Sequence, residues 1–283
     1  MELYKDIINA PHTLIAGTTG SGKSNVMNGI IRQIMTDFTP QTAEMVMIDP
    51  KVVELIDYRN TAFCTAFESE AENVPALLDE VIDTMETRYH KMGEEHIKQF
   101  VGKKIFVIVD ELADLMISPQ SKSIKLKLQK ILQKGRAADI HIIAATQAPN
   151  RQIIPANLIL NFTNRLALRC VSAIESRQII NQAGAELLPQ YGKGLYFSPK
   201  GLVTVPIQLT EDNTELVNKW TVRKAEPKVE IEEAEEERII YIAAPKDYSE
   251  PKRRTYDPNR TADIIRNIGL AIGGIGFVLA MLA

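Results

Sequence analysis

Residues 17–24 read GTTGSGKS, which fits the phosphate-binding pattern G-x-x-x-x-G-K-[ST] at every fixed position. Such a loop turns backbone N–H groups toward an anion, and its glycines allow a close approach that a Cβ would block. We expect Lys23 to reach the β- and γ-phosphates of a nucleoside triphosphate and the Ser24 hydroxyl to bind Mg²⁺. The residues expected to surround the phosphates are Gly17, Thr18, Thr19, Gly20, Ser21, Gly22, Lys23 and Ser24.

The segments on either side of this loop have the patterns of a strand and a helix. Leu14 to Ala16 is an apolar run typical of the end of a buried strand. After the loop, apolar residues recur at helical spacing and mark the inner face of a helix: Val26, Met27, Ile30, Ile31 and Ile34. The phosphates would then lie at a helix N-terminus, where unpaired N–H groups and the helix dipole favour negative charge.

Further along the chain, apolar runs alternate with helical patterns. The first predicted strand begins at His12, and the others cover residues 45–48, 105–109, 140–145, 165–171, 195–197 and 203–209. Predicted helices include residues 70–92, residues 122–136 and one that begins at Ser176-Arg177. This alternation predicts an α/β fold with a mainly parallel sheet that is flanked by helices on both faces.

A pair of carboxylates, Asp110 and Glu111, follows the predicted strand 105–109. In ATPases with such a phosphate-binding loop, a strand that ends in Asp supplies the carboxylate on the Mg²⁺ side, and a following Glu activates the attacking water. We therefore predict that Asp110 binds the metal ion and that Glu111 is the general base. Taken alone, the pair would also fit a helix N-cap, so its specificity depends on the loop at residues 17–24.

Two further patterns allow both a functional and a structural interpretation. Thr146 and Gln147 end a predicted strand, where Gln147 suits a sensor of the γ-phosphate or an ordinary strand end. Residues 122–136 carry six basic side chains among apolar ones, and we interpret most of these as the solvated face of a helix. Because the net charge is −3, any contact with nucleic acid must come from local patches or from a ring that gathers them.

Several strings together resemble the motor domain of the FtsK/SpoIIIE DNA translocases, over about residues 10–210. They are PHTLIAGTTGSGKS (11–24), MIDPKVVEL (47–55), IVDELADLM (108–116), QKGRAADIHIIAATQ (133–147) and SRQIINQAGAE (176–186). The resemblance implies a RecA-like P-loop NTPase that binds ATP and Mg²⁺. It also implies a ring, usually a hexamer, that surrounds double-stranded DNA and moves it by ATP hydrolysis.

The resemblance implies roles for two arginines and shows three departures from the family pattern. Arg136 matches the position proposed as an arginine finger toward the neighbouring subunit's nucleotide, and Arg177 matches a position that faces the DNA backbone. Ala173 and Ile159 stand where some members have basic DNA-loop residues, and Ala148 replaces the arginine of the family's TQRP. We then expect either a weaker grip on DNA or contact through other residues, such as Arg151, Arg165 and Arg169.

The tail differs in composition from the rest of the chain. We predict a motor domain over residues 1–210, an acidic and then basic linker over 211–263, and an apolar C-terminal helix over 264–283. At 1.5 Å per residue the last segment spans about 30 Å, the thickness of the hydrocarbon core of a membrane. We expect this helix either to hold a cytoplasmic motor at the inner face of a bacterial cell membrane or to dock on protein.

These patterns favour an ATP-driven double-stranded DNA translocase, a minimal motor that serves transfer or segregation of a mobile element. The alternative is an FtsK-like ATPase that powers protein secretion or assembly at the membrane, which the acidic net charge together with Ala173 and Ile159 leaves open. A nucleotide-gated scaffold with little hydrolysis fits less well, because Asp110 and Glu111 are both present. A P-loop kinase also fits less well, because no arginine-rich lid segment follows the core.

Overall fold

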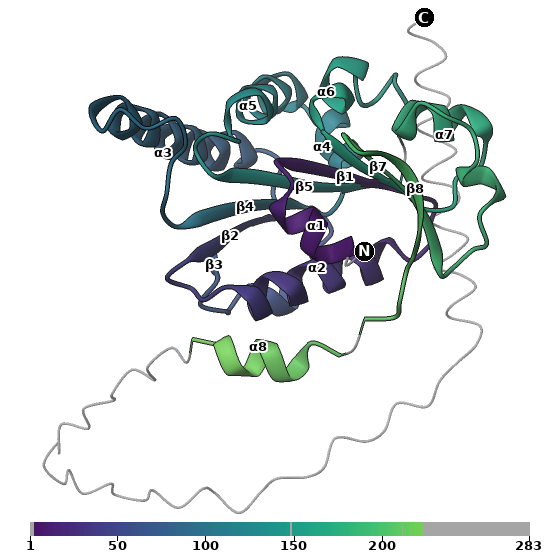
Figure 1. Ribbon diagram of the computed structural model, residues 1–283, viewed down its shortest axis with the longest axis horizontal. Helices are drawn as coiled ribbons and strands as arrows, with labels where there is room; N and C mark the ends of the chain where they lie inside the picture. Colours follow the sequence, from purple (N-terminus) through teal and green to yellow (C-terminus); the bar gives the residue numbers. More distant parts are fainter. Residues whose placement is uncertain (1–2, 148, 211, 223–283) are drawn as a thin grey trace, which may run out of the picture. The chain divides into compact units, whose positions relative to one another are not determined.

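The computed structural model describes residues 3–147, 149–210 and 212–222, in which eight strands form one sheet (Figure 1). The strands are β1 (His12–Ala16), β2 (Ala43–Ile48), β3 (Cys64–Glu68), β4 (Lys104–Val109), β5 (Ile140–Thr146), β6 (Asn164–Ala167), β7 (Lys193–Ser198) and β8 (Gly201–Pro206). They lie in the order β3-β2-β4-β5-β1-β6-β7-β8. The strands from β3 to β6 in this order are parallel, and β7 and β8 add an antiparallel hairpin at one side.

The order of the strands brings three predicted site segments to one edge of the sheet. β5 lies between β1 and β4, with Ala16 opposite Thr146 and Val109 opposite Ala144. Because these strands are parallel, the segments that follow them all begin at the carboxyl edge of the sheet, where open α/β sheets bind ligands. The structure therefore confirms the mainly parallel α/β sheet that the sequence predicts.

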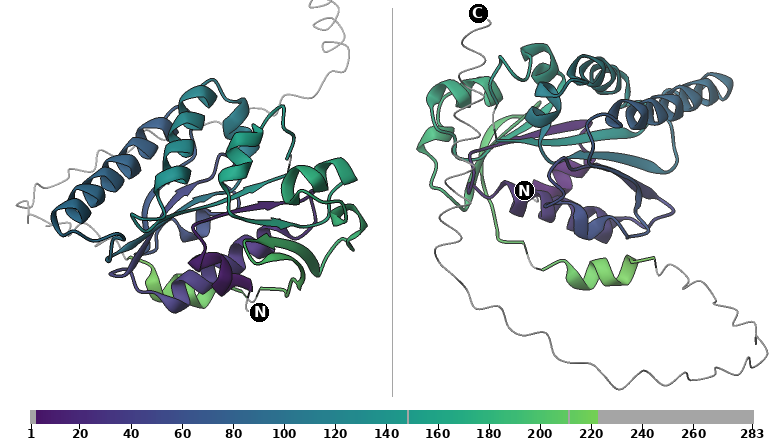
Figure 2. Two further views of the ribbon diagram at one scale, coloured as in Figure 1. Left: turned by 45° about the horizontal axis from the view of Figure 1, so that its top comes forward. Right: turned by 180° about the vertical axis from the view of Figure 1, so that it is seen from behind.

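Helices cover both faces of the sheet, as predicted (Figure 1). On one face lie α1 (Leu3–Asn9), α2 (Lys23–Asp37) and α8 (Thr214–Trp220). On the other lie α3 (Val74–Glu94), α4 (Leu112–Ile117), α5 (Ser121–Lys134) and α6 (Ala156–Asn161). Figure 2 shows α3 and α5 side by side on this second face. The short α7 (Ala173–Ile180) packs beside β6 and β7.

Alternate residues of the central strands enter two separate hydrophobic clusters. In β4, Val107 and Val109 pack with α3, α4 and α5, whereas Phe106 and Ile108 pack with α2. A strand that is buried on both faces needs apolar side chains at every position, which explains its continuous apolar run. The predicted inner face of α2 is also confirmed, with at most 1% exposure at each of Val26, Met27, Ile30, Ile31 and Ile34.

Some elements differ from those predicted. α1 precedes the first strand, and β3 is an additional edge strand whose partly exposed residues form no continuous apolar run. The prediction that a helix begins at Ser176-Arg177 was wrong, because α7 begins at Ala173. The Ser172 hydroxyl caps this helix by accepting a hydrogen bond from the Glu175 N–H (3.3 Å).

The folded unit continues beyond the boundary at residue 210 that the sequence suggested. The Ala62 N–H donates to the Trp220 carbonyl oxygen (2.7 Å), and the Trp220 ring meets Phe63 edge-on with 5.3 Å between ring centroids. Residues 212–222 therefore pack as part of the motor fold. The rest of the predicted linker and the predicted apolar helix at 264–283 lie outside the described residues. Within the described residues, no helix is long and apolar enough to cross a membrane.

Candidate nucleotide site

The phosphate-binding loop depends on glycine at specific positions. The Gly17 N–H donates to the Thr146 carbonyl oxygen of β5 (3.3 Å). A Cβ on Gly17 would lie 2.5 Å from Ser21 Oγ and 2.7 Å from Leu168 Cβ, so only glycine fits without movement of the loop. Gly22 has a φ of 95°, in the left-handed region, and α2 begins at the next residue. The loop therefore delivers Lys23 and Ser24 into the first turn of α2.

The Lys23 ammonium is buried against the predicted carboxylate pair. Its Nζ donates to the Asp110 carbonyl oxygen (2.9 Å) and to Asp110 Oδ1 (3.2 Å), and it lies 3.9 Å from Glu111 Oε2. Burial raises the pKa of Asp110, and the Lys23 charge opposes this effect. The structure thus brings Lys23 together with the Asp110-Glu111 pair, which lies far from it in the sequence and was predicted to share its site.

Glu111 connects this carboxylate pair to the end of β5. Its carboxylate accepts hydrogen bonds from the Gln147 N–H (3.0 Å) and from the Ala113 N–H (3.3 Å). The second bond caps α4, so the helix N-cap that the pair would also fit is present. The Gln147 side chain in turn accepts a hydrogen bond from the Thr19 hydroxyl (2.8 Å). Glu111, Gln147 and the phosphate-binding loop therefore form one hydrogen-bonded group.

Glu54 belongs to this site, although the sequence analysis did not single it out. The Ser24 hydroxyl, which was predicted to bind Mg²⁺, donates a hydrogen bond to Glu54 Oε1. The loop that holds Glu54 is built on the buried Asp49, whose carboxylate accepts hydrogen bonds of 3.0–3.2 Å from five successive backbone N–H groups. The donors are Lys51, Val52, Val53, Glu54 and Leu55. Asp49 directly follows β2 at the carboxyl edge of the sheet, and this position is the sequence feature that could have pointed to the loop and to Glu54.

The oxygen donors at the site suit Mg²⁺. The Ser24 hydroxyl and the Asp110 carboxylate are hard ligands of the kind that Mg²⁺ takes, and Glu54 adds a third oxygen donor beside Ser24. Among the described residues, no three His, Cys, Asp or Glu side chains are grouped closely enough to hold a metal ion alone. A Mg²⁺ ion at this site would complete its coordination with water and phosphate oxygens.

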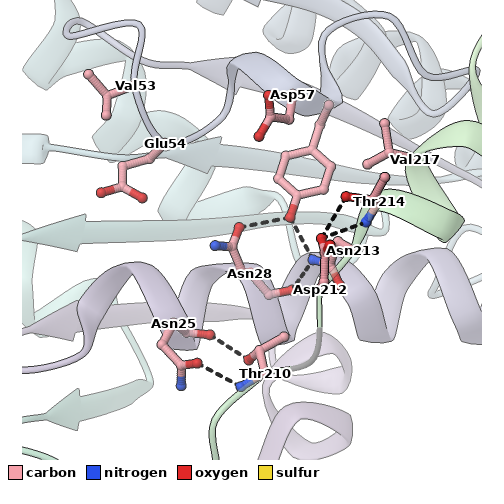
Figure 3. Close-up of a pocket in the computed structure, with 11 residues that line it drawn as sticks. Asn25, Asn28, Val53, Glu54, Asp57, Thr210, Asp212, Asn213, Thr214 and Val217 are labelled. Atoms are coloured by element: carbon pink, nitrogen blue, oxygen red, sulfur yellow. Dashed lines mark hydrogen bonds between the residues drawn. The ribbon is translucent and has the colours of Figure 1, made fainter.

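A polar pocket of about 500 Å³ adjoins the site between α2 and the segment that precedes α8 (Figure 3). The Tyr58 hydroxyl donates to Asn28 Oδ1 (2.7 Å), and Asn213 Nδ2 donates to the Tyr58 oxygen (2.6 Å). Glu54 also lines this pocket. The pocket therefore extends from residues 210–217 to Glu54, whose carboxylate accepts the hydrogen bond of Ser24.

The two arginines with roles implied by the family resemblance lie in different parts of the fold. Arg136 is exposed in the connection between α5 and β5, at the amino edge of the sheet, and Arg177 is exposed on α7. The suggestion that Arg165 contacts DNA was wrong. Its side chain is 4% exposed, donates to the Ile179 carbonyl oxygen (2.8 Å) and stacks over Phe197.

Arg151 and Arg169 are exposed, so they stay available for contact with DNA. In the basic helix α5, three lysines form ion pairs with α3, as expected for a partly solvated face. The pairs are Lys127–Asp79, Lys130–Glu86 and Lys134–Glu86.

This site has the features of a P-loop nucleotide-binding protein. The glycine-containing loop precedes the N-terminus of α2, and Lys23 contacts the Asp-Glu pair that follows a strand of a parallel sheet. The chain belongs to the FtsK/SpoIIIE family, whose pattern it matches over residues 2–104 and 101–151. It is 35% identical over 228 residues to the DNA translocase FtsK of Mycobacterium tuberculosis, covering 72% of this chain and 27% of that protein. It is 36% identical over 211 residues to the DNA translocase FtsK of Streptococcus pneumoniae, covering 68% and 27%. The chain thus spans about a quarter of these relatives.

Solved structures support the fold. The pCW3 conjugation coupling protein TcpA, in its monomer form with ATPγS, superposes with a TM-score of 0.67 at 24% identity, over 76% of this chain and 65% of that one. The cytoplasmic domain of the type VII secretion ATPase EccC of Thermomonospora curvata gives 0.61 at 20% identity, over 76% and 28%. At sequence identities this low, the similarity shows a shared fold and nothing more.

Proposed function

We propose that this chain is the motor of an ATP-driven double-stranded DNA translocase, with a RecA-like core that works as a ring, by family analogy a hexamer. The observation that carries the proposal is the meeting of Lys23, Asp110, Glu111 and Gln147 beside one phosphate-binding loop. Membership of the FtsK/SpoIIIE family supports the choice of DNA as the substrate. We further propose that it serves transfer or segregation of a mobile element and works at the inner face of a cell membrane.

Each residue at the carboxyl edge has a chemical task in this proposal. The loop N–H groups and Lys23 would hold the phosphates, and Ser24 and Asp110 would hold Mg²⁺, which when bound would neutralise charge on the phosphate oxygens. Glu111 takes a proton from the attacking water, and its hydrogen bonds from Gln147 and Ala113 orient its carboxylate. The Gln147 side chain lies against Thr19 of the loop, where it can respond to the γ-phosphate.

Arg136 would serve a neighbouring subunit rather than its own site. β5 has seven residues, so its two ends lie about 20 Å apart at ~3.3 Å per residue. Arg136 precedes β5, whereas its own phosphate-binding loop adjoins the other end. A guanidinium supplied in trans stabilises charge on the transferring phosphoryl group and makes hydrolysis depend on assembly.

The direct test is the ATPase rate with and without duplex DNA. We expect duplex DNA to stimulate hydrolysis, and Lys23→Ala or Glu111→Gln to remove at least about 99% of the stimulated rate, because each variant loses a group in contact with the reaction. A rate that does not respond to duplex DNA over a range of salt concentrations would contradict the motor proposal.

A second candidate is an FtsK-like ATPase that drives polypeptide secretion or assembly. The net charge of −3 and the burial of Arg165 favour it, because they reduce the positive charge available to phosphates. Displacement of a third strand from a DNA triplex separates the candidates, because an enzyme that moves along duplex DNA displaces that strand. ATPase activity without displacement would favour the secretion enzyme.

A further inference from the structure

The connection that carries Arg136, residues 135–139, is a tightly folded loop. Its ends are joined by a hydrogen bond from the Ile140 N–H to the Gly135 carbonyl oxygen (3.0 Å). A Cβ on Gly135 would lie 2.7 Å from the Ile131 carbonyl oxygen and 2.8 Å from that of Ile140, so backbone fills the space around this residue. Asp139 has a φ of 56°, a left-handed conformation that is uncommon outside glycine. The loop therefore needs support from its surroundings.

Arg88 supplies the first part of this support from α3. Its guanidinium is 8% exposed and donates to the Ala138 carbonyl oxygen (2.7 Å) and to the Lys103 carbonyl oxygen (2.7 Å). It also stacks over Phe100, with 4.5 Å from Cζ to the ring centroid. The Phe100 N–H donates to the Ala137 carbonyl oxygen (2.8 Å). Two successive carbonyl groups after Arg136 are thus fixed.

A charged group supplies the second part of the support. Lys104 Nζ forms an ion pair with Asp139 Oδ1 (2.5 Å), and His141 Nε2 lies 2.9 Å from the same oxygen. The other ring nitrogen of His141 donates to the Ala10 carbonyl oxygen (2.7 Å), which fixes the ring. Burial alone would raise the pKa of Asp139, but hydrogen bonds from His141 and Lys104 lower it overall. Asp139 is therefore held as a carboxylate at the end of the loop.

We propose that Arg88, Lys104 and Asp139 are positioning residues that hold Arg136 ready for the nucleotide of the neighbouring subunit. This inference rests on the proposed function, in which Arg136 acts in trans. None of the three reaches the phosphate-binding loop of its own chain, because all contact the amino edge of the sheet. Their effect on hydrolysis passes through the loop at 135–139, and a displacement of a catalytic group by about 1 Å costs roughly a hundredfold in rate.

The test uses mixed assemblies of the full chain, in which each subunit has one role. Lys23→Ala chains can donate Arg136 but cannot hydrolyse ATP, and Arg136→Ala chains can hydrolyse ATP only with a donated arginine. Mixing the two should restore duplex-stimulated ATPase activity. Asp139→Asn is then added to the donor chain. Asparagine tolerates a left-handed conformation, so this variant removes the charge and keeps the backbone.

We expect the donor with Lys23→Ala and Asp139→Asn to support about tenfold less activity than the Lys23→Ala donor. Lys104→Met on the donor should act in the same direction. Lys103→Met is the matched control, because this neighbouring lysine forms its ion pair with Glu44 (2.7 Å) instead of with the loop, and it should change nothing. In the opposite arrangement, Asp139→Asn is placed on the chain that hydrolyses ATP. This chain receives Arg136 from Lys23→Ala neighbours, whose loops are intact, so it should keep its activity.

The outcomes separate the two levels of inference. If the mixture of Lys23→Ala and Arg136→Ala chains stays inactive, the arginine does not act in trans and the proposed function fails at this point. If that mixture is active but Asp139→Asn on the donor has no effect, the positioning role is refuted. A loss of equal size in both arrangements would show a general defect of the fold and would also refute it.

Discussion

At the residue scale, Glu54 is the least expected member of the site. Its carboxylate accepts a hydrogen bond from the Ser24 hydroxyl, which the sequence predicts to bind Mg²⁺. Asp49 fixes the backbone of its loop through five N–H groups, so the Glu54 backbone is held where its side chain reaches Ser24. A fixed negative charge beside the metal ligand should strengthen the binding of a cation there.

We predict that Glu54→Gln raises the Mg²⁺ concentration for half-maximal binding of a fluorescent ATP analogue about tenfold, which corresponds to ~1.4 kcal/mol. Asp57→Asn is the control, since Asp57 is an exposed carboxylate that lines the same pocket, whereas the Ser24 hydroxyl bonds to Glu54. Binding in the presence of a chelator should be equal for the wild type and both variants. Equal Mg²⁺ dependence for Glu54→Gln and the wild type would show that Glu54 does not serve the metal ion.

The contrast between Arg165 and Arg177 gives a second prediction at this scale. We expect Arg177→Ala to weaken duplex binding several-fold and to lower the slope of its salt dependence by about one, as expected for loss of one phosphate contact. Arg165→Met should leave both quantities unchanged, because its buried guanidinium cannot reach DNA. Duplex affinity at several salt concentrations measures both effects. A lower salt slope for Arg165→Met would mean that β6 opens when DNA binds.

The main site residues could be predicted from the sequence because their positions follow from topology. Lys23, Asp110 and Gln147 each follow a strand of a parallel sheet, and such strands end at one edge. Glu54 could not be predicted in the same way, because its side chain reaches Ser24 only through the loop that Asp49 builds. Burial of Arg165 was also hidden, because an arginine in a short strand looks the same whether its side chain faces water or α7.

At the element scale, β1 and β5 are joined by more than backbone hydrogen bonds. His12 is 1% exposed at the start of β1, and its Nδ1 accepts a hydrogen bond from the Ile142 N–H of β5 (3.0 Å). Burial lowers the pKa of His12 to about 3, with a smaller contribution from His141. The neutral ring therefore belongs to the folded chain, and its protonation favours the unfolded chain.

This pKa predicts a loss of stability in acid. Unfolded chains bind a proton at His12 below about pH 6.5, whereas the folded chain does so only near pH 3. The free energy of unfolding should thus fall as the pH is lowered through this window, by up to ~1.4 kcal/mol per pH unit from His12. His12→Asn should reduce the slope, and the exposed His90→Asn should not. Denaturant melts at several pH values measure it, and identical slopes for His12→Asn and wild type would contradict the assignment.

Elements that the sequence did not predict lie at the periphery of the sheet. β3 and α8 have few fully buried residues, so neither shows the strong apolar pattern of the central strands. α8 packs through the partly buried Leu216 and Val217 and is also held by polar and aromatic contacts, such as those of Asn213 and Trp220. Such contacts bring together segments that are distant in sequence, and their partners cannot be identified from periodicity alone.

At the scale of the whole molecule, the proposed function assigns Arg136 to the site of a neighbouring subunit, so a single chain would have an incomplete site. We predict that ATPase activity per chain rises steeply with protein concentration, by roughly a hundredfold or more between monomer and assembly. Arg136→Ala should remove this rise and leave the ATP affinity of the monomer unchanged. Light scattering together with rate measurements would test this. A dilute monomer as active as the assembly would show that the site is complete within one chain.

In the proposed ring, the direction of strand β5 would affect the order in which the subunits hydrolyse ATP. Its carboxyl end adjoins the phosphate-binding loop through the Gln147–Thr19 hydrogen bond, and its amino end follows the loop that carries Arg136, which in the proposed function acts on the next chain. A signal that passes along this strand leaves the site of one subunit and enters that of a single neighbour. The direction of this strand would then determine whether ATP hydrolysis proceeds clockwise or anticlockwise around the ring, whatever substrate the ring encloses.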